Sequence, residues 1–569
     1  MLREPRLMLY ARTLAHLQPG QIGHLVLRRL VRPPVMRTRS RAEGERRRAV
    51  GLAAIVPDAG TASGATLSFL NVGKSFDPAR FDWQSAEMSR LWRYNLHYFD
   101  YILGADRAVA DSGQLLSSWI AANPRGRGDA WEPYPLSLRV VNWIKLFLRG
   151  DFAPHVQREW VHSLHEQAAW LERHLEYHLL ANHLLKNGKA LLFAGAYLAG
   201  ADADRWLRKG AGILTAAVSE QLLDDGGHFE RSPMYHAIVV EDFLDVLNLL
   251  RGSPALAGIM DANMLAGRTR TALEFLADLT YPDGSVAMFN DSVAGVAPPF
   301  GTLAQYAGEV MDYDAAKRGP ALRTIAYGDS GYYGVAEGQD RLLIDCGEIG
   351  PRYQPGHAHC DTLSYELVLA GRPVVVDSGV HDYEDSPMRR YVRSTAAHNT
   401  VRIDGCEQSE LWGAFRVARR ARPLYARIGR RDAAHVLFEG SHDGFTRLPG
   451  SPVHVRRIEY RHGCCTVQDR VTGSGTHRAE SFIHLHPDLM AVLDGSSVMV
   501  TRHDGEPVAR IDVLAADQVD VGTSWHCPEF GKRLANAVIT LTCEGPLPVT
   551  VAYAVHRIAN DAAGMVSPA

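Results

Sequence analysis

The sequence predicts an α+β multidomain protein in which a helical N-terminal part precedes a C-terminal antiparallel β-sandwich. Its 569 residues suffice for several structural units, because one domain typically takes about 100–200 residues. Apolar residues recur at helical spacing from about residue 80 to 320, and they alternate with polar residues in short runs after that point. We therefore place the domain boundary near residues 320–330.

Residues 1–70 are predicted to form a basic helical arm followed by a linker rich in Ser, Arg, Glu, Gly and Ala. Residues 1–50 hold 12 Arg against 3 Glu, and Arg interrupts every short apolar run. Such a segment can attach to an acidic partner or membrane surface, but more often it is a solvated arm or packs on its own domain. We find no continuous apolar core of a signal peptide and no apolar run of about 20 residues. We expect a cytoplasmic protein without a membrane span, while export by a non-standard route stays open.

Residues 71–325 are predicted to form an all-α layer or ring. Within 156–180 the apolar residues keep helical spacing, and similar stripes follow at 188–199, 205–223, 237–251 and 262–280. Gly, Pro and Asp separate the stripes at 123–126, 224–227 and 281–284, which favours short loops between helices of ordinary length.

Residues 326–569 are predicted to be a β-sandwich. Leu363, Tyr365, Leu367 and Leu369 alternate with other residues before a turn at 371–373. Further strands are expected at 341–345, 399–403, 435–439, 454–460, 464–471, 481–485 and 548–555. Many short strands without helices between them indicate antiparallel sheets.

Composition excludes several classes of protein. The 61 basic and 64 acidic residues nearly balance, whereas a nucleic-acid-binding chain usually has a basic excess. Only 7 of the basic residues are Lys, and the abundant Arg either reflects codon usage or suits an anionic ligand. The 7 Cys include no CxxC pair, which argues against a disulfide framework and a thiolate zinc site.

Four clusters of polar residues lie at breaks between the predicted elements: 181–187, 226–236, 356–361 and 377–400. Taken singly, each has an ordinary structural explanation, such as a helix N-cap for Asn182 or a core aromatic for Tyr235. Together, His359, Asp377 and His398 provide two imidazoles and a carboxylate, a ligand set that suits zinc or a similar divalent ion. The separations are long, so only the fold can bring these ligands together.

The order of these motifs resembles the heparinase II/III-like polysaccharide lyases, whose relatives include heparin, chondroitin, hyaluronan and alginate lyases. The matching segments are 182–185, 226–236, 356–361, 376–379 and 397–401. The resemblance spans roughly residues 80–420 and is strongest at 356–403. It implies an incomplete (α/α) toroid followed by a β-sandwich, with substrate bound between the two.

The resemblance also implies roles for individual residues. Lyases of this family cleave uronic-acid glycans by β-elimination, which requires the sugar carboxylate to be neutralised before a proton is removed beside it. Asn182 and His183 match the groups that neutralise the carboxylate, and Tyr235 and His357 match the proton-transfer residues. His359, Asp377 and His398 match the ligands of a structural divalent metal, with Zn favoured over Mn or Ca. Tyr383 is one residue out of register with a second tyrosine of some members.

Seven further residues are candidates for binding an anionic polysaccharide or oligosaccharide. They supply cations, a stacking ring or hydrogen-bonding groups near the motifs: Arg139, Trp131, Lys186, Glu230, Arg231, His236 and Asn290. Lys186 stands where some members have Glu, and a cation there would suit an anionic substrate.

Two other functions stay open on the sequence alone. One is a glycoside hydrolase that uses carboxylates such as Asp225, Glu230 or Glu241, and the other is a non-catalytic glycan-binding protein. The sequence leaves undecided which uronate polymer is cut, whether cutting is endolytic or exolytic, and the oligomeric state.

Overall fold

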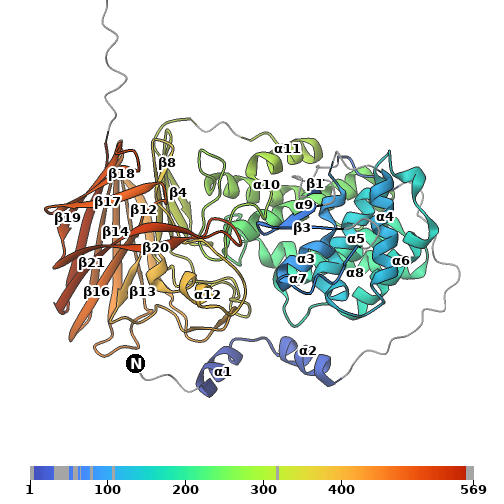
Figure 1. Cartoon of the computed structure of the whole chain (residues 1–569), viewed down its shortest axis with the longest axis horizontal. Coiled ribbons are helices and arrows are strands. Elements are labelled where there is room, and N and C mark those ends of the chain that lie inside the picture. The colour runs from blue at the N-terminus through green and yellow to red at the C-terminus, as the bar shows by residue number, and fades with distance from the viewer. Residues whose placement is uncertain are drawn as a thin grey trace, which may run out of the picture.

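The computed structural model describes residues 6–30, 50–54, 62–63, 66–76, 81–104, 109–315 and 319–558. A helical domain and a β-rich domain lie side by side, and two N-terminal helices run along one edge of both (Figure 1). The predicted α+β architecture is confirmed. The predicted boundary at 325/326 falls inside a strand, because the helical domain ends at Met311 and the first strand of the β-domain begins at Arg323.

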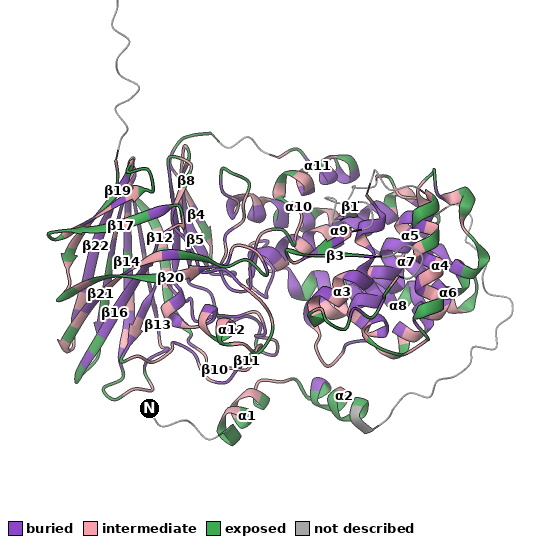
Figure 2. Ribbon diagram, in the orientation of Figure 1, coloured by how far each residue is buried: buried purple, intermediate pink, exposed green. Residues whose placement is uncertain are grey.

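The helical domain consists of nine α-helices within the described residues. They are α3 (Arg90–Tyr98), α4 (Val109–Ala122), α5 (Pro133–Leu148), α6 (Arg158–Arg173), α7 (Ala181–Tyr197), α8 (Ala201–Gln221), α9 (Pro233–Gly252), α10 (Ala262–Asp278) and α11 (Phe300–Met311). Glycines let α7 and α8 approach closely, since a Cβ at Gly195 would lie 2.4 Å from Leu207 N. Helices α5, α7 and α9 are buried along most of their length (Figure 2), so their polar residues must find partners inside the protein.

A small sheet precedes these helices. Its strands are β1 (Ala62–Ser63), β2 (Thr66–Phe69) and β3 (Val72–Ser75), joined in antiparallel order. Phe69 packs edge-on against Trp92 of α3, with ring centroids 5.1 Å apart. The predicted boundary at 70/71 therefore falls in the turn between two strands that belong to one sheet.

The β-domain contains three larger antiparallel sheets. A five-stranded sheet takes β4 (Arg323–Tyr327), β5 (Tyr332–Glu337), β6 (Asp340–Asp345), β7 (Tyr365–Leu369) and β8 (Arg372–Val375) in sequence order. An eight-stranded sheet has the order β12 (Pro423–Asp432), β13 (His435–His442), β14 (Val453–Arg461), β15 (Cys464–Thr472), β22 (Val549–Arg557), β19 (Pro507–Ala515), β18 (Ser497–Arg502) and β17 (Leu489–Asp494). A four-stranded sheet has the order β20 (Gln518–His526), β21 (Leu534–Pro546), β16 (Thr476–His484) and β9 (Val401–Ile403).

Side chains from all three sheets meet in one core. Leu342 of the five-stranded sheet, Ile458 of the eight-stranded sheet and Ile539 of the four-stranded sheet belong to the same buried cluster. Strand β14 alternates buried and more exposed residues, as expected for a strand with one face on a core. The predicted antiparallel sandwich is therefore confirmed, with a short helix α12 (Pro387–Val392) and a two-stranded ribbon, β10 (Leu411–Trp412) and β11 (Arg416–Val417), in its loops.

The N-terminal arm touches both domains. Helix α1 (Arg6–Leu14) packs on the β-domain, where the Tyr10 and Trp412 rings lie 4.6 Å apart and Arg12 pairs with Glu410. Helix α2 (Pro19–Leu30) lies beside the helical domain, and the His24 ring stacks on Tyr177. Of the two sequence-based alternatives, the described part of the arm follows the one in which it packs on its own protein. Among the described residues, none of the helices combines the length and apolar character that crossing a bilayer requires.

Candidate functional site at the domain junction

The turns that start α7 and α9 carry predicted functional residues of the helical domain. Before α7, Leu180 and Ala181 have φ of 63° and 50°, a conformation that costs non-glycine residues about 1–3 kcal/mol each. This turn places Asn182 and His183 in the first turn of α7. At α9, the side chain of Ser232 accepts a hydrogen bond from Tyr235 N, and Pro233 occupies the first helical position. Tyr235 is thereby held at a helix end.

Tyr235 meets two loop residues of the β-domain. Its ring stacks on His357, which lies between β6 and β7, with centroids 3.8 Å apart. Its hydroxyl lies 3.2 Å from the hydroxyl of Tyr383, which lies between β8 and α12. Burial raises the pKa of Tyr235 well above its ordinary value, so the phenol is neutral and can donate a proton. The structure thus brings together three predicted catalytic residues from two domains.

A buried carboxylate, Asp291, fixes the histidine of this group. Its Oδ2 lies 3.0 Å from His357 Nδ1, and its Oδ1 lies 2.8 Å from His359 Nε2. Arg389 of α12 donates to both oxygens of Asp291, and both side chains of this ion pair are fully buried. Burial alone would raise the pKa of Asp291, but Arg389 and the two histidines hold it well below its usual range. Because Asp291 is an acceptor, His357 Nδ1 donates to it, which leaves Nε2 as the ring nitrogen that can accept a proton.

Asn182 is bound to a second buried carboxylate. Its Nδ2 donates to Glu230 Oε2 at 2.8 Å and Oε1 at 3.0 Å, while its Oδ1 is buried without a partner among the described residues. Glu230 Oε2 also lies 3.8 Å from His357 Nε2. In this structure the side-chain amide of Asn182 is therefore hydrogen-bonded to Glu230. Its Nδ2 is not free to donate a hydrogen bond to a sugar carboxylate. Glu230, predicted to bind substrate, is a buried link between Asn182 and His357.

His183 lies at the surface of the same group. Its Nδ1 is 3.1 Å from Glu176 Oε1, and its ring lies 4.6 Å from that of Tyr134. Burial acts to lower the pKa of His183, but the Glu176 carboxylate outweighs it and the net shift is upward. The cationic imidazole is therefore favoured, as the partner of an anionic group should be.

Sequence reasoning missed Glu176 and Arg389 as members of the site, whereas Tyr134 and Asp291 were possible contributors to a substrate cleft. Glu176 stands seven residues before His183, so an acidic residue beside the motif was the available signal. The sequence pattern carried no comparable signal for Arg389.

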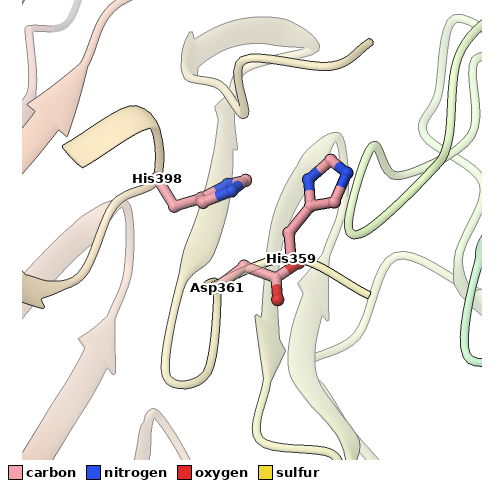
Figure 3. A group of neighbouring side chains, drawn as sticks. All are labelled: His359, Asp361 and His398. Atoms are coloured by element: carbon pink, nitrogen blue, oxygen red, sulfur yellow. The ribbon is translucent and has the colours of Figure 1, made fainter. Parts of the chain in front are cut away.

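A second group, next to the first, could hold a metal ion. Nitrogen atoms of His359 and His398 and a carboxylate oxygen of Asp361 all lie within 4.8 Å of one another, and all three residues are buried (Figure 3). His359 Nδ1 and His398 Nε2 have no hydrogen-bond partner among the described residues. Burial lowers the pKa of His359 to about 3, which keeps its ring neutral, the form that binds metals. Two unpartnered imidazole nitrogens beside a carboxylate fit a divalent ion.

The predicted ligand Asp377 has a different place in this structure. Its Oδ2 lies 2.7 Å from His398 Nδ1 and orients that ring, while Asp361 supplies the carboxylate of the group. The Nδ1–H of His398 is thereby used, and Nε2 is left to face Asp361 and His359. The loop before β7 brings Asp361 beside the two imidazoles, so Asp361 replaces Asp377 as the carboxylate of the group.

Comparison with known sequences agrees with this geometry. Residues 81–301 match the description "Heparinase II/III N-terminus", and residues 320–557 match "Heparinase II/III-like, C-terminal". The chain belongs to the heparinase II/III-like family. The resemblance drawn from the motifs is thereby confirmed.

The individual relatives match different shares of this chain. A "Heparin-sulfate lyase" from Pedobacter heparinus is 28% identical over 323 residues, which cover 51% of this chain and 47% of that protein. The chain spans about half the length of the heparin-sulfate lyases it matches. "FtsZ-localized protein C" from Caulobacter vibrioides is 26% identical over 471 residues, covering 76% of this chain and 75% of that one.

The fold of this heparinase II/III-like chain is also found in a solved structure. The crystal structure of heparinase III superposes with a TM-score of 0.67 at 18% identity, covering 85% of this chain and 80% of that one. This similarity concerns the arrangement of the two domains.

Three of the residues predicted to bind substrate lie buried in the helical domain of this chain. Arg139 is fully buried and donates to Gln167 Oε1 and to the carbonyls of His97 and Ala130. Trp131 donates from Nε1 to Asn123 O and packs against Trp170. Lys186 is buried, and its Nζ lies 2.7 Å from Asp242 Oδ1. In this structure the polar atoms of these residues already have partners inside the domain, so nothing in it supports a substrate-binding role for them, and that role stays a prediction.

His236, Arg231 and Asn290 also act within the protein. His236 is buried, and its Nε2 lies 2.9 Å from Ala272 O. Arg231 donates to the carbonyls of Ser330 and Asp329, and so ties the helical domain to the β4–β5 turn. Asn290 accepts a hydrogen bond from His359 N and donates its own N–H to Asp361 Oδ2. In this structure these residues make contacts within the protein, and their role in substrate binding stays a prediction.

Proposed function

We propose that the protein is a polysaccharide lyase that cleaves uronic-acid-containing glycans, of the glycosaminoglycan type, by β-elimination. The observation that carries this proposal is the stacked pair of Tyr235 and His357 at the domain junction. A neutral phenol and an imidazole with a free lone pair are a matched acid and base, and each comes from a different domain. The names of the heparin-sulfate lyase relatives support the substrate class.

The reaction assigns a role to each group. His183, in its cationic form, faces the carboxylate of the uronic acid and makes the neighbouring C–H more acidic. His357 Nε2 takes that proton, and the electron pair of the broken C–H bond forms a carbon–carbon double bond. The glycosidic C–O bond breaks, and its oxygen receives the proton of the Tyr235 hydroxyl. Tyr383 lies within hydrogen-bonding distance of that hydroxyl and can orient it.

The hydrolase alternative finds less support in this structure. A glycoside hydrolase needs two carboxyl groups facing the sugar from opposite sides. Glu230 is bound by Asn182, and Asp225 accepts hydrogen bonds from Ser330 N and Oγ. Neither carboxylate is free to act on a water molecule or a sugar.

A direct assay separates these functions. The protein is incubated with heparan sulfate, chondroitin sulfate, hyaluronan and alginate while ultraviolet absorbance is recorded. We expect absorbance to rise with at least one glycosaminoglycan, because the lyase product has a double bond conjugated to a carboxylate. New reducing ends without absorbance would indicate a hydrolase. Binding without any product would indicate a glycan-binding protein, and either result would contradict the proposal.

We also propose that His359, Asp361 and His398 hold a structural divalent ion, with zinc favoured by the two imidazoles. When bound, the ion would fix the segment that carries His357, two residues from His359. We expect chelator treatment to lower the melting temperature of the wild-type protein, since an ion that binds only the folded state stabilises it. The metal content, measured by mass spectrometry, should fall in parallel.

The His398→Ala variant is the control for this experiment. It should contain less metal, and the chelator should shift its melting temperature much less than that of the wild type. A wild-type protein that keeps its full melting temperature after complete metal removal would contradict a structural ion.

A further inference from the structure

A cationic cavity of about 410 Å³ is lined by residues from the end of helix α1 and from loops of the β-domain, apart from the catalytic and metal groups. Five arginines and one histidine line it, against one carboxylate. The residues that give it this character are Arg12, His16, Arg419, Arg420, Arg422, Arg447 and Asp443. Like charges repel unless a counter-charge is present, so this composition needs an explanation.

Arg420 lines this cavity and has two hydrogen-bonding groups without a partner among the described residues. Its Nη1 donates to Arg352 O at 2.7 Å, but its Nε and Nη2 are buried and have no partner among the described residues. These two parallel N–H groups form the fork that binds an oxyanion with two hydrogen bonds. Elsewhere in this chain the same fork holds a carboxylate, in the pairs Arg149–Asp151, Arg205–Glu172 and Arg456–Asp469.

The acidic groups around the cavity do not fill this fork. Asp443 Oδ1 accepts from Arg422 N, and Glu410 pairs with Arg12 and Arg419. Glu348 acts on Arg420 only through the longer-range field. Burial, followed by Arg352 and Arg422, lowers the pKa of Arg420 to about 10, so its charge is held at a cost.

His16, which follows the end of α1, shows the same lack of a partner. Its Nδ1 is buried without a hydrogen bond among the described residues. It lines the cavity together with Arg420, so two chain segments about 400 residues apart bring side chains with unpartnered polar atoms to one cavity. A buried polar atom without a partner costs free energy, which a ligand able to bond it would recover.

We propose that this cavity binds a tetrahedral oxyanion, the sulfo or phosphoryl group of a small ligand or of a glycan chain. Two oxygens of the group accept from Arg420 Nε and Nη2, while Arg422 and His16, which line the same cavity, complete the shell. A tetrahedral group fits better than a carboxylate because it offers oxygens toward more than one wall. The site does not depend on the lyase reaction, so either can be disproved without the other.

Binding can be measured by calorimetry with inorganic sulfate and inorganic phosphate at constant ionic strength, adjusted with sodium chloride. We expect saturable binding to the wild-type protein and an affinity loss of roughly tenfold or more in Arg420→Gln, the worth of a charge-assisted hydrogen-bonding pair. Arg205→Gln is the matched control, because its fork is occupied by Glu172 on the helical domain. It should bind both ions as the wild type does.

Arg422→Gln guards against a folding defect, since the Arg422 side chain is exposed and its loss should leave the core intact. It should also weaken binding. Displacement by a sulfated disaccharide would assign the site to sulfo groups, and displacement by a sugar phosphate to phosphoryl groups. Absence of binding beyond chloride, unchanged affinity in both cavity variants, or displacement by neither sugar would each overturn the proposal.

Discussion

Tyr235→Phe is expected to lower kcat for glycan cleavage by about 10²–10⁴-fold, the usual contribution of a proton-transfer group. The substitution removes the hydroxyl that lies 3.2 Å from Tyr383 and that would protonate the leaving oxygen. It keeps the ring that stacks on His357, so the packing of the site should be preserved. Initial rates of ultraviolet absorbance increase, measured at saturating substrate, test this expectation.

Tyr425→Phe is the matched control for this variant. Tyr425 is an exposed residue of β12 whose hydroxyl contacts Glu439, and its loss should leave kcat unchanged. Circular dichroism should show that both variants are folded. Turnover like that of the wild type in Tyr235→Phe would remove the basis for its role as the acid.

The variant Asp291→Asn is expected to destabilise the protein by about 3–5 kcal/mol, because it leaves the buried Arg389 guanidinium without a counter-charge. The amide has the size of the carboxylate, so lost volume does not contribute. The change also weakens the contact that orients His357, and activity should fall with stability. The midpoint of urea denaturation and the melting temperature measure the first effect, and the ultraviolet assay measures the second.

Asp151→Asn provides the comparison with a surface ion pair. Asp151 pairs with Arg149 through two hydrogen bonds, but its side chain is about half exposed (54%). Such pairs are worth about 0–1 kcal/mol, so the denaturation midpoint should barely move. Equal effects of the two substitutions would show that the Asp291–Arg389 pair does not hold the junction together.

Much of the fold could be predicted from sequence because its signals are local. The helical spacing in 156–180 corresponds to α6, and the alternation after 361 corresponds to β7. Strands β17 to β21 were not predicted from the sequence. Several of them expose residues on both faces and lack a clear alternation of buried and exposed positions, and β20 is an example. Neither the β1–β3 sheet nor α12 gave a long enough pattern to detect.

The candidate site was predictable only in part. His357, His359 and His398 stand in motifs whose order was informative, and the structure brings them to one junction together with Tyr235. Residue type alone did not separate binding groups from core groups. Arg139 and Lys186 suggested an anionic ligand, but both are buried with partners inside the helical domain.

By itself, the sequence determined the order of the helical and β-rich parts and the residue types available for proton transfer and metal binding. The tertiary structure decided which carboxylate lies beside which basic group: Asp361 rather than Asp377 beside His359, Asp291 against Arg389, and, in the part of the chain that the structure describes, no acid against the fork of Arg420. The physical reason is that electrostatic and hydrogen-bonding partners act over a few ångströms in space, whereas these partners lie tens to hundreds of residues apart along the chain.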